Sequence, residues 1–142
     1  MQAPAGYEYD DNPGRIDINL VSAFLADEAY WGRWRSPDII EQQIRTAWRV
    51  VGAYERSTGA QVGFARAFSD GFAAAYLADV FVVPAHRGHG LGVGIVRTMI
   101  EEGPGAKFLW MLHTRDARTL YEKFGFVPRE NDRYLERAAR FG

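Results

Sequence analysis

A glycine-rich stretch between an apolar run and a helical pattern constrains the fold of this chain more than any other feature. HRGHGLGVG (residues 86–94) directly follows YLADVFVVP and directly precedes IVRTMIEE, whose apolar residues have helical spacing. Glycine costs stability in ordered structure, so this density indicates turns with positive φ, close approach of a ligand, or both. Backbone amides at the amino end of a helix attract phosphate groups. The stretch therefore predicts a strand, a candidate phosphate loop and a helix, with a simple packed turn as the alternative.

Two common nucleotide-binding motifs do not fit this stretch. The dinucleotide fingerprint G-x-G-x-x-G fails because Val93 and Ile95 occupy the positions that its third glycine would need. A P-loop requires Gly-Lys followed by Ser or Thr, and the sequence contains no such tripeptide. The loop therefore needs a different explanation.

Composition limits the classes of protein to which the loop can belong. Of the 142 residues, 47% are hydrophobic and 25% are charged, so we expect residues 1–142 to form one domain. A net charge of -1 with scattered Lys and Arg predicts no nucleic-acid partner and no membrane partner. The absence of cysteine excludes disulfides, thiolate zinc sites and a Cys nucleophile, and we expect no metal centre. With neither a signal-peptide pattern nor a membrane-length apolar run, the sequence predicts a cytoplasmic protein.

The first half of the chain predicts two helices before the hydrophobic period changes. The first dozen residues have the character of a loose or edge segment, and residues 16–19 alternate as a short strand would. Residues 20–31 place apolar side chains along one helical stripe. Ser36, followed by Pro37 and Asp38, is typical of a helix start.

The second half predicts an antiparallel meander followed by alternating helices and strands. The meander strands are expected at residues 48–55, 61–70 and 72–83. A helix then ends at Gly103, an apolar strand covers residues 107–114, and Asp116 caps a helix that Gly125 ends. Residues 126–130 and 133–139 are candidates for one or two closing strands. The predicted class is α+β, in the order β-α-α-β-β-β-α-β-α-β.

Two motifs on these elements resemble those of the GNAT acetyltransferase superfamily. The first is R-x-x-G-x-G, with Arg87, Gly90 and Gly92, which is similar to that family's pyrophosphate-binding motif. The second is TRDARTLYEKFGF (residues 114–126), which resembles the family's later signature. The likeness covers residues 48–127. It implies a mostly antiparallel central sheet with helices on both faces, two parallel strands that splay apart, and acetyl-CoA as cofactor.

The resemblance also implies which residues hold the cofactor. Val80, Phe81 and Val82 would pair with the pantetheine amides, and the loop from Arg87 to Val93 would surround the pyrophosphate with main-chain amides. The residues of that loop are Arg87, Gly88, His89, Gly90, Leu91, Gly92 and Val93. Thr114 stands where Asn is common in the family, which would weaken one polar contact with the cofactor.

Three residues are candidates for catalysis. Tyr121 matches the family's tyrosine that protonates the departing CoA sulfur, and a phenol with a pKa of about 10 can serve as that donor. Tyr76 and Leu109 occupy positions where relatives keep a carboxylate, so the base is not the usual one. Asp79, a charge inside an apolar run, is the best substitute, and His113 is the second choice. The alternatives are a core aromatic for Tyr121, a strand acid held by a neighbouring donor for Asp79, and a satisfied core histidine for His113.

The resemblance also implies that the first two helices and their connection cover the acceptor side. Aromatic residues there could form a wall for an apolar or cationic substrate, and arginines, including Arg35, could bind a carboxylate. The candidate substrate-binding residues are Tyr30, Trp31, Arg33 and Trp34. The implied reaction is attack of a primary amine, from a small-molecule or amino-acid-like acceptor, on the thioester of acetyl-CoA. The alternative is a non-catalytic acyl-CoA-binding sensor, and a homodimer is compatible with either.

Overall fold

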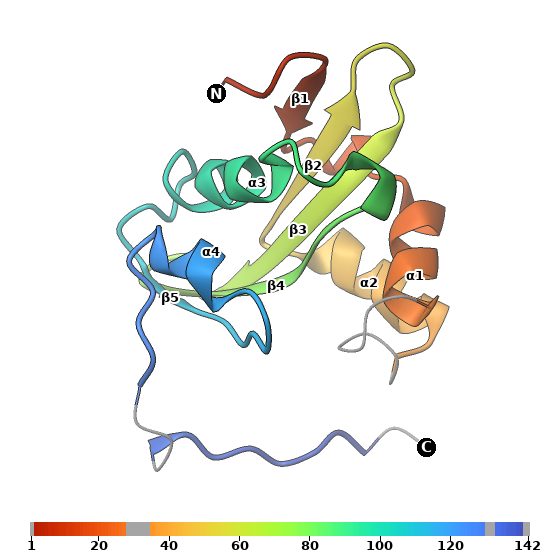
Figure 1. Cartoon of the computed structure of the whole chain (residues 1–142). Helices are drawn as coiled ribbons and strands as arrows, with labels where there is room; N and C mark the ends of the chain where they lie inside the picture. Colours follow the sequence, from red (N-terminus) through yellow and green to blue (C-terminus); the bar gives the residue numbers. More distant parts are fainter. Residues whose placement is uncertain (1, 28–34, 130–132, 141–142) are drawn as a thin grey trace.

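Three apolar segments in the middle of the chain form the centre of a five-stranded sheet (Figure 1). The computed structural model describes residues 2–27, 35–129 and 133–140. The central strands β2 (Arg49–Glu55), β3 (Gln61–Ser69) and β4 (Ala74–Val82) pair antiparallel through short turns. They confirm the predicted meander.

The two edge strands come from distant parts of the sequence. Strand β1 (Tyr7–Asp10) pairs antiparallel with β2, and β5 (Leu109–Met111) pairs parallel with β4. The order across the sheet is therefore β1-β2-β3-β4-β5. The parallel pair at one edge involves only the first three residues of β4, Ala74–Tyr76.

Helices cover both faces of the sheet. Their bounds are α1 Ile18–Asp27, α2 Pro37–Thr46, α3 Leu91–Ile100 and α4 Arg118–Glu122, with short 3-10 turns η1 Pro13–Arg15 and η2 Pro84–His86. Helix α2 begins as predicted, because the Ser36 hydroxyl accepts a hydrogen bond of 3.3 Å from the Ile39 amide and Pro37 starts the first turn.

Each face of the sheet has its own apolar core. On one face α3 and α4 pack against the sheet through a cluster that includes Val51, Ala65, Leu77, Ile95, Met99 and Tyr121. On the other face α1 and α2 pack through a cluster that includes Phe24, Leu25, Ile40, Ile44, Phe64 and Phe81. Phe24 and Phe81 stack there with ring centroids 4.0 Å apart. The predicted α+β class, with a mostly antiparallel sheet and helices on both faces, is confirmed.

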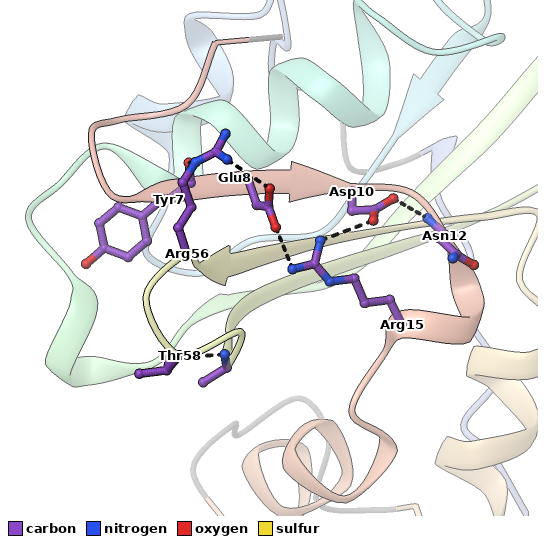
Figure 2. A network of polar contacts seen from close by, with 8 residues as sticks. Tyr7, Glu8, Asp10, Asn12, Arg15, Arg56 and Thr58 are labelled. Atoms are coloured by element: carbon purple, nitrogen blue, oxygen red, sulfur yellow. Dashed lines mark hydrogen bonds and ion pairs between the residues drawn. The ribbon is translucent and has the colours of Figure 1, made fainter.

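Ion pairs on the surface attach β1 and η1 to β2 (Figure 2). The Arg15 guanidinium lies 2.6 Å from a Glu8 carboxylate oxygen and 3.2 Å from one of Asp10. Arg56, in the turn after β2, reaches Glu8 at 3.3 Å and donates a hydrogen bond to the Tyr7 carbonyl. These contacts stabilise an edge strand of only four residues.

The prediction for residues 16–19 is wrong. The edge strand lies earlier, at Tyr7–Asp10, and Ile18 already belongs to α1. The Asp17 side chain accepts a hydrogen bond from the Leu20 amide, so this segment starts a helix. The stripe that α1 buries consists of Val21, Phe24 and Leu25.

The elements after α3 are shorter than predicted. Strand β5 has three residues where an eight-residue strand was expected, and Leu109 and Met111 on it are exposed. Helix α4 starts at Arg118, and the Thr114 hydroxyl, not Asp116, accepts the hydrogen bond from the Ala117 amide. Residues 126–129 and 133–140, as far as they are described, contain no strand, so the predicted closing strands are absent from those ranges. None of the described helices is long and apolar enough to cross a membrane.

Candidate active site

The glycine-rich stretch forms the turn that leads from β4 into α3. After η2, Gly88 and Gly90 adopt positive φ values of 89° and 79°, a conformation that costs glycine little. Gly90 is the N-cap of α3, and no side chain caps the helix there. The first amides of a helix lack intrahelical partners and carry its positive dipole end, so they suit an anion. This amino end fits the predicted pyrophosphate.

Side chains of the loop hold it against the sheet. Arg87 donates a hydrogen bond of 2.9 Å from Nε to the Val82 carbonyl, which ties the loop to the end of β4. The Tyr7 hydroxyl lies 2.8 Å from His86 Nδ1, and the rings of Tyr7 and His89 lie 5.6 Å apart. The loop is therefore fixed from β4 on one side and from β1 on the other.

Helix α4 meets the loop at Gly92. A Cβ atom at this position would lie 3.5 Å from Leu120 Cδ1 and 4.0 Å from Val82 Cγ2. The amino end of α3, the end of β4 and α4 thus converge. The two sequence motifs, separated by more than twenty residues, contribute to one region.

Strands β4 and β5 pair for only three residues. Their parallel register runs from Ala74 opposite Leu109 to Tyr76 opposite Met111. Strand β5 ends there, whereas β4 continues through Val80, Phe81 and Val82. Those residues keep β3 as their partner, with Phe81 opposite Phe64 and Val82 opposite Gly63. The predicted cofactor segment is Val80–Val82. Among the described residues, no strand continues β5 alongside this segment.

A β-bulge interrupts β4 just before this segment. Phe64 pairs with Phe81 but Arg66 pairs with Ala78, so Asp79 and Val80 together stand opposite one residue of β3. Asp79 has a φ of 58°, the only positive value at a non-glycine residue in the described ranges. Leu77 and, beyond the bulge, Val80 and Val82 all pack on the α3 side. The bulge thus changes which residues of β4 face each side.

Asp79 is clamped by two arginines. Its two oxygens accept hydrogen bonds of 2.8 and 2.9 Å from Arg35, and Oδ2 accepts a third, of 2.6 Å, from Arg66 Nε. Burial alone would raise the pKa of Asp79, but the hydrogen bonds and positive charges of Arg35 and Arg66 outweigh it and leave that pKa below its usual value. A carboxylate held in this way is a weak base. This geometry matches the alternative of a strand acid held by neighbouring donors.

His113 belongs to a different network, near the end of β5. It is exposed, and its Nδ1 shares a hydrogen bond with the Tyr76 hydroxyl. Burial, followed by the neighbouring Tyr134, raises the pKa of Tyr76, so its hydroxyl stays protonated at neutral pH. Tyr76 in turn stacks on Phe68, with ring centroids 4.9 Å apart. His113 is therefore exposed to solvent, and the Tyr76 side chain that holds it is itself stacked on Phe68.

Tyr121 is buried in α4, as part of the core between α3 and the sheet. Its ring packs edge-on against Phe126, with centroids 5.8 Å apart. Gly125, with a φ of 85°, ends the helix as predicted and lets the Phe126 amide reach the Tyr121 carbonyl. The Thr114 hydroxyl accepts a hydrogen bond from the Ala117 amide just before this helix, so Thr114 has a partner within the protein.

The predicted acceptor residues Tyr30, Trp31, Arg33 and Trp34 lie outside the described residues. Arg35, which was expected to bind a substrate carboxylate, instead binds the carboxylate of Asp79. Arg66 was not predicted at all. Its signal was available, because Arg66 and Asp79 are charges of opposite sign inside two consecutive apolar strands.

Comparisons with known proteins bear on the family and the fold of this chain. The acetyltransferase (GNAT) domain family matches residues 47–128, more than half of the chain. A candidate acetyltransferase from Gibberella zeae is 26% identical over 135 residues, which cover 82% of this chain and 76% of that protein.

Solved structures show the same fold. The structure of a candidate GNAT-family acetyltransferase from Xanthomonas campestris pv. campestris aligns with a TM-score of 0.87 at 29% identity, over 97% of this chain and 96% of that one. Glucosamine-6-phosphate N-acetyltransferase from Arabidopsis thaliana shares the fold at a TM-score of 0.60 and 13% identity, over 96% of this chain and 99% of that one. Acetyltransferases of the GNAT family use acyl-CoA donors. By sequence motifs, fold and family match together, the chain belongs to the GNAT acetyltransferase family.

Proposed function

We propose that this protein is an N-acetyltransferase that moves the acetyl group of acetyl-CoA to a primary amine of a small-molecule or amino-acid-like acceptor. The observation that carries the proposal is the uncapped amino end of α3 behind Gly88 and Gly90, which follows the part of β4 that β5 does not pair with. We treat residues 1–142 as one catalytic domain, which works alone or as a homodimer.

The cofactor site would use main-chain groups more than side chains. The amides from Arg87 to Val93 would hold the pyrophosphate, and the backbone of Val80–Val82 would hold the pantetheine arm. Bound acetyl-CoA supplies the thioester carbonyl that the amine attacks. An amide of β4 near Val82 would stabilise negative charge on that carbonyl oxygen, as an oxyanion site does.

Tyr121 is proposed as the proton donor to the CoA sulfur. It lies in α4, whose Leu120 meets Gly92 of the loop. Tyr121 is buried and its ring packs against Phe126, which fixes the ring. The hydroxyl would donate its proton as the C–S bond breaks, so that CoA leaves as a thiol.

His113 is proposed as the proton acceptor for the amine, in preference to Asp79. An alkyl amine is mostly protonated at neutral pH and must lose a proton before it attacks. In the tautomer with a proton on Nδ1, His113 donates that proton to the Tyr76 hydroxyl, and Nε2 keeps the lone pair that accepts the amine proton. Exposure of His113 gives an acceptor access, whereas both oxygens of Asp79 are bound to arginines.

Release of free thiol from acetyl-CoA, with a panel of amines, tests the proposal. We expect amine-dependent release by the wild type and a loss of roughly a hundredfold or more in kcat for Tyr121→Phe, with acetyl-CoA affinity retained. Tyr54→Phe is the matched control. Tyr54 is also buried, but its hydroxyl has no hydrogen-bond partner among the described residues, so turnover should not change.

Two other outcomes would contradict the proposal. Binding of acetyl-CoA without thiol release for any amine would favour the sensor that is the alternative function. If the folded protein binds neither CoA nor acetyl-CoA, the glycine loop is not a pyrophosphate-binding loop.

A further inference from the structure

The backbone of β4 is bent at Asp79 by a conformation that its side chain disfavours. A φ of 58° at a residue with a Cβ is uncommon and costs free energy, although Asp tolerates it better than most residues. Such a conformation persists where the surroundings over-determine it. The surroundings here are the two guanidinium groups that bind the Asp79 carboxylate.

The clamp is almost completely removed from water. The side chains of Arg35, Arg66 and Asp79 are 2%, 9% and 4% exposed. Hydrogen bonds between ionised groups are strong, and those at Asp79 use both of its oxygens. Removing the carboxylate would leave the buried positive charges of Arg35 and Arg66 without their negative partner, which would lower the stability of the fold.

The clamp also joins three separate elements. Arg35 directly precedes the N-cap of α2, Arg66 belongs to β3, and Asp79 is the bulge residue of β4. Arg35 is further held by Gln43 of α2 at 2.6 Å. The amino end of α2, on the predicted acceptor side, is therefore tied to the strand on the predicted donor side.

The position of the bulge decides which face of the sheet each of the next three side chains, those of Val80, Phe81 and Val82, points to. Val80 and Val82 pack toward α3, and Phe81 packs into the opposite cluster with Phe24. Because side chains alternate along a strand, loss of the extra residue at 79 would turn Val80–Val82 to the opposite faces. The backbone proposed to hold the pantetheine and polarise the thioester would then be misaligned.

We propose that Asp79 is a positioning residue, whose clamping by Arg35 and Arg66 fixes the β4 bulge and thereby the register of Val80–Val82 for catalysis. The inference rests on the proposed function and deepens it, because Asp79 acts through the backbone of β4 and transfers no proton.

A series of substitutions at one position separates the possible roles. Asp79→Asn keeps a side chain that tolerates positive φ and one oxygen that accepts from an arginine. Asp79→Gly removes the strain and the clamp together, and Asp79→Ala removes the clamp but keeps the strain. A positioning role predicts that kcat decreases in the order Asp, Asn, Gly, Ala, with a loss of roughly a hundredfold for Gly, the cost of a misplacement of about 1 Å.

The other roles predict different patterns. If Asp79 is the general base, all three variants lose the same activity and the acidic limb of the pH–rate profile disappears. If Asp79 only stabilises the fold, kcat per folded molecule stays at the wild-type value in all three. Either result would overturn the proposal, which requires graded losses and an acidic limb that keeps its midpoint in Asp79→Asn.

Hydrogen exchange of the β4 amides gives a readout that does not depend on turnover. Exchange in β2 follows the global stability, which also falls in Asp79→Gly. Relative to β2, we expect exchange at residues 79–82 to rise by on the order of tenfold or more, as when one charge-assisted hydrogen bond is lost. An unchanged exchange rate at residues 79–82 would contradict the proposal that the clamp fixes the bulge. If the wild type binds CoA but releases no thiol, the proposed function fails while this measurement still decides the clamp.

A milder variant covers the case in which Asp79 variants do not fold. Arg35→Lys keeps the positive charge but replaces a two-point contact with a single ammonium. We expect the same direction of change in exchange and kcat, with a smaller amplitude. Arg45→Lys, on an exposed pair with Glu41 in the same helix, is the matched control and should change neither.

Discussion

The ion pairs of β1 and the ion pairs at the β4 bulge use the same kinds of side chain in different surroundings. Arg15 and Glu8 are each 30% exposed, and Figure 2 shows Arg15 reaching from η1 back to Glu8 and Asp10 on β1. Arg35 and Asp79 are 2% and 4% exposed. Water screens the first pair and not the second, so similar distances correspond to different energetic consequences.

The comparison shows that burial, more than geometry, decides what an ion pair does for a protein. The surface network adds to the β1–β2 ladder and attaches the adjoining turn η1 to β1. The buried network holds a backbone conformation that the ladder does not hold, because β3 and β4 change register there. The difference can be tested by breaking each network in turn.

The largest expected effect is the loss of stability in Asp79→Ala. We expect the free energy of unfolding to fall by about 3–5 kcal/mol, because two arginines lose a buried carboxylate. The control Glu8→Ala should cost no more than about 1 kcal/mol. Denaturant unfolding at neutral pH measures both, and equal losses would contradict the comparison.

Acid should weaken the buried network in a defined direction. The pKa of Asp79 is lower in the folded protein than its usual value of 3.8, so the unfolded chain takes up the proton first. The stability that Asp79 contributes is therefore full above the unfolded pKa and is lost as the pH falls through the folded pKa. Unfolding of wild type and Asp79→Asn between about pH 6 and pH 2 measures this, and their difference should shrink toward low pH. A difference that grows instead would mean that the pKa is raised.

Arg15→Ala should have a smaller effect on stability. Besides Glu8 and Asp10, Arg15 covers the Tyr54 ring, with the guanidinium carbon 3.8 Å from the ring centroid. We expect a loss of about 1 kcal/mol from the ring contact and the exposed pairs together. Arg45→Ala, which breaks one exposed helical pair, should cost less in the same unfolding assay. A loss as large as that of Asp79→Ala would show that exposure does not weaken the surface network.

The smallest expected effect is the response to salt. The Debye length falls to about 3 Å at 1 M salt, so the stability lost in Glu8→Gln should shrink to near zero there. The stability lost in Asp79→Asn should be retained, because salt does not reach the clamp. Unfolding at low and high salt compares the two, and parallel salt dependence would mean that the Asp79 clamp is open to solvent.

Local patterns were sufficient to predict much of the fold. Ser36 and Pro37 start a helix through contacts within four residues, and the meander strands follow from alternation and the turn at Gly71. The glycine loop was predictable because few conformations suit so many glycines before a helix. The family motifs then related these elements to a cofactor.

Features that depend on distant residues were not predicted. Tyr7–Asp10 becomes a strand by pairing with β2, some forty residues later, while residues 16–19 show a similar alternation and start a helix. Arg35 and Asp79 are 44 positions apart, so the sequence could mark the charge at 79 as unusual but could not name its partner. No local pattern in the sequence predicts the bulge, because the positive φ of Asp79 depends on the contacts that its carboxylate makes with distant residues.

The hydrogen bond between Tyr7 and His86 has a consequence for how the protein folds. It links residues 79 positions apart, so the glycine loop receives its support from β1 only after most of the chain has been assembled. Contacts of large sequence separation form late, because a long loop must close first. We therefore expect refolding protein to regain the β2–β4 meander before it regains affinity for CoA. Competence to bind the cofactor would then be acquired in the last step of folding.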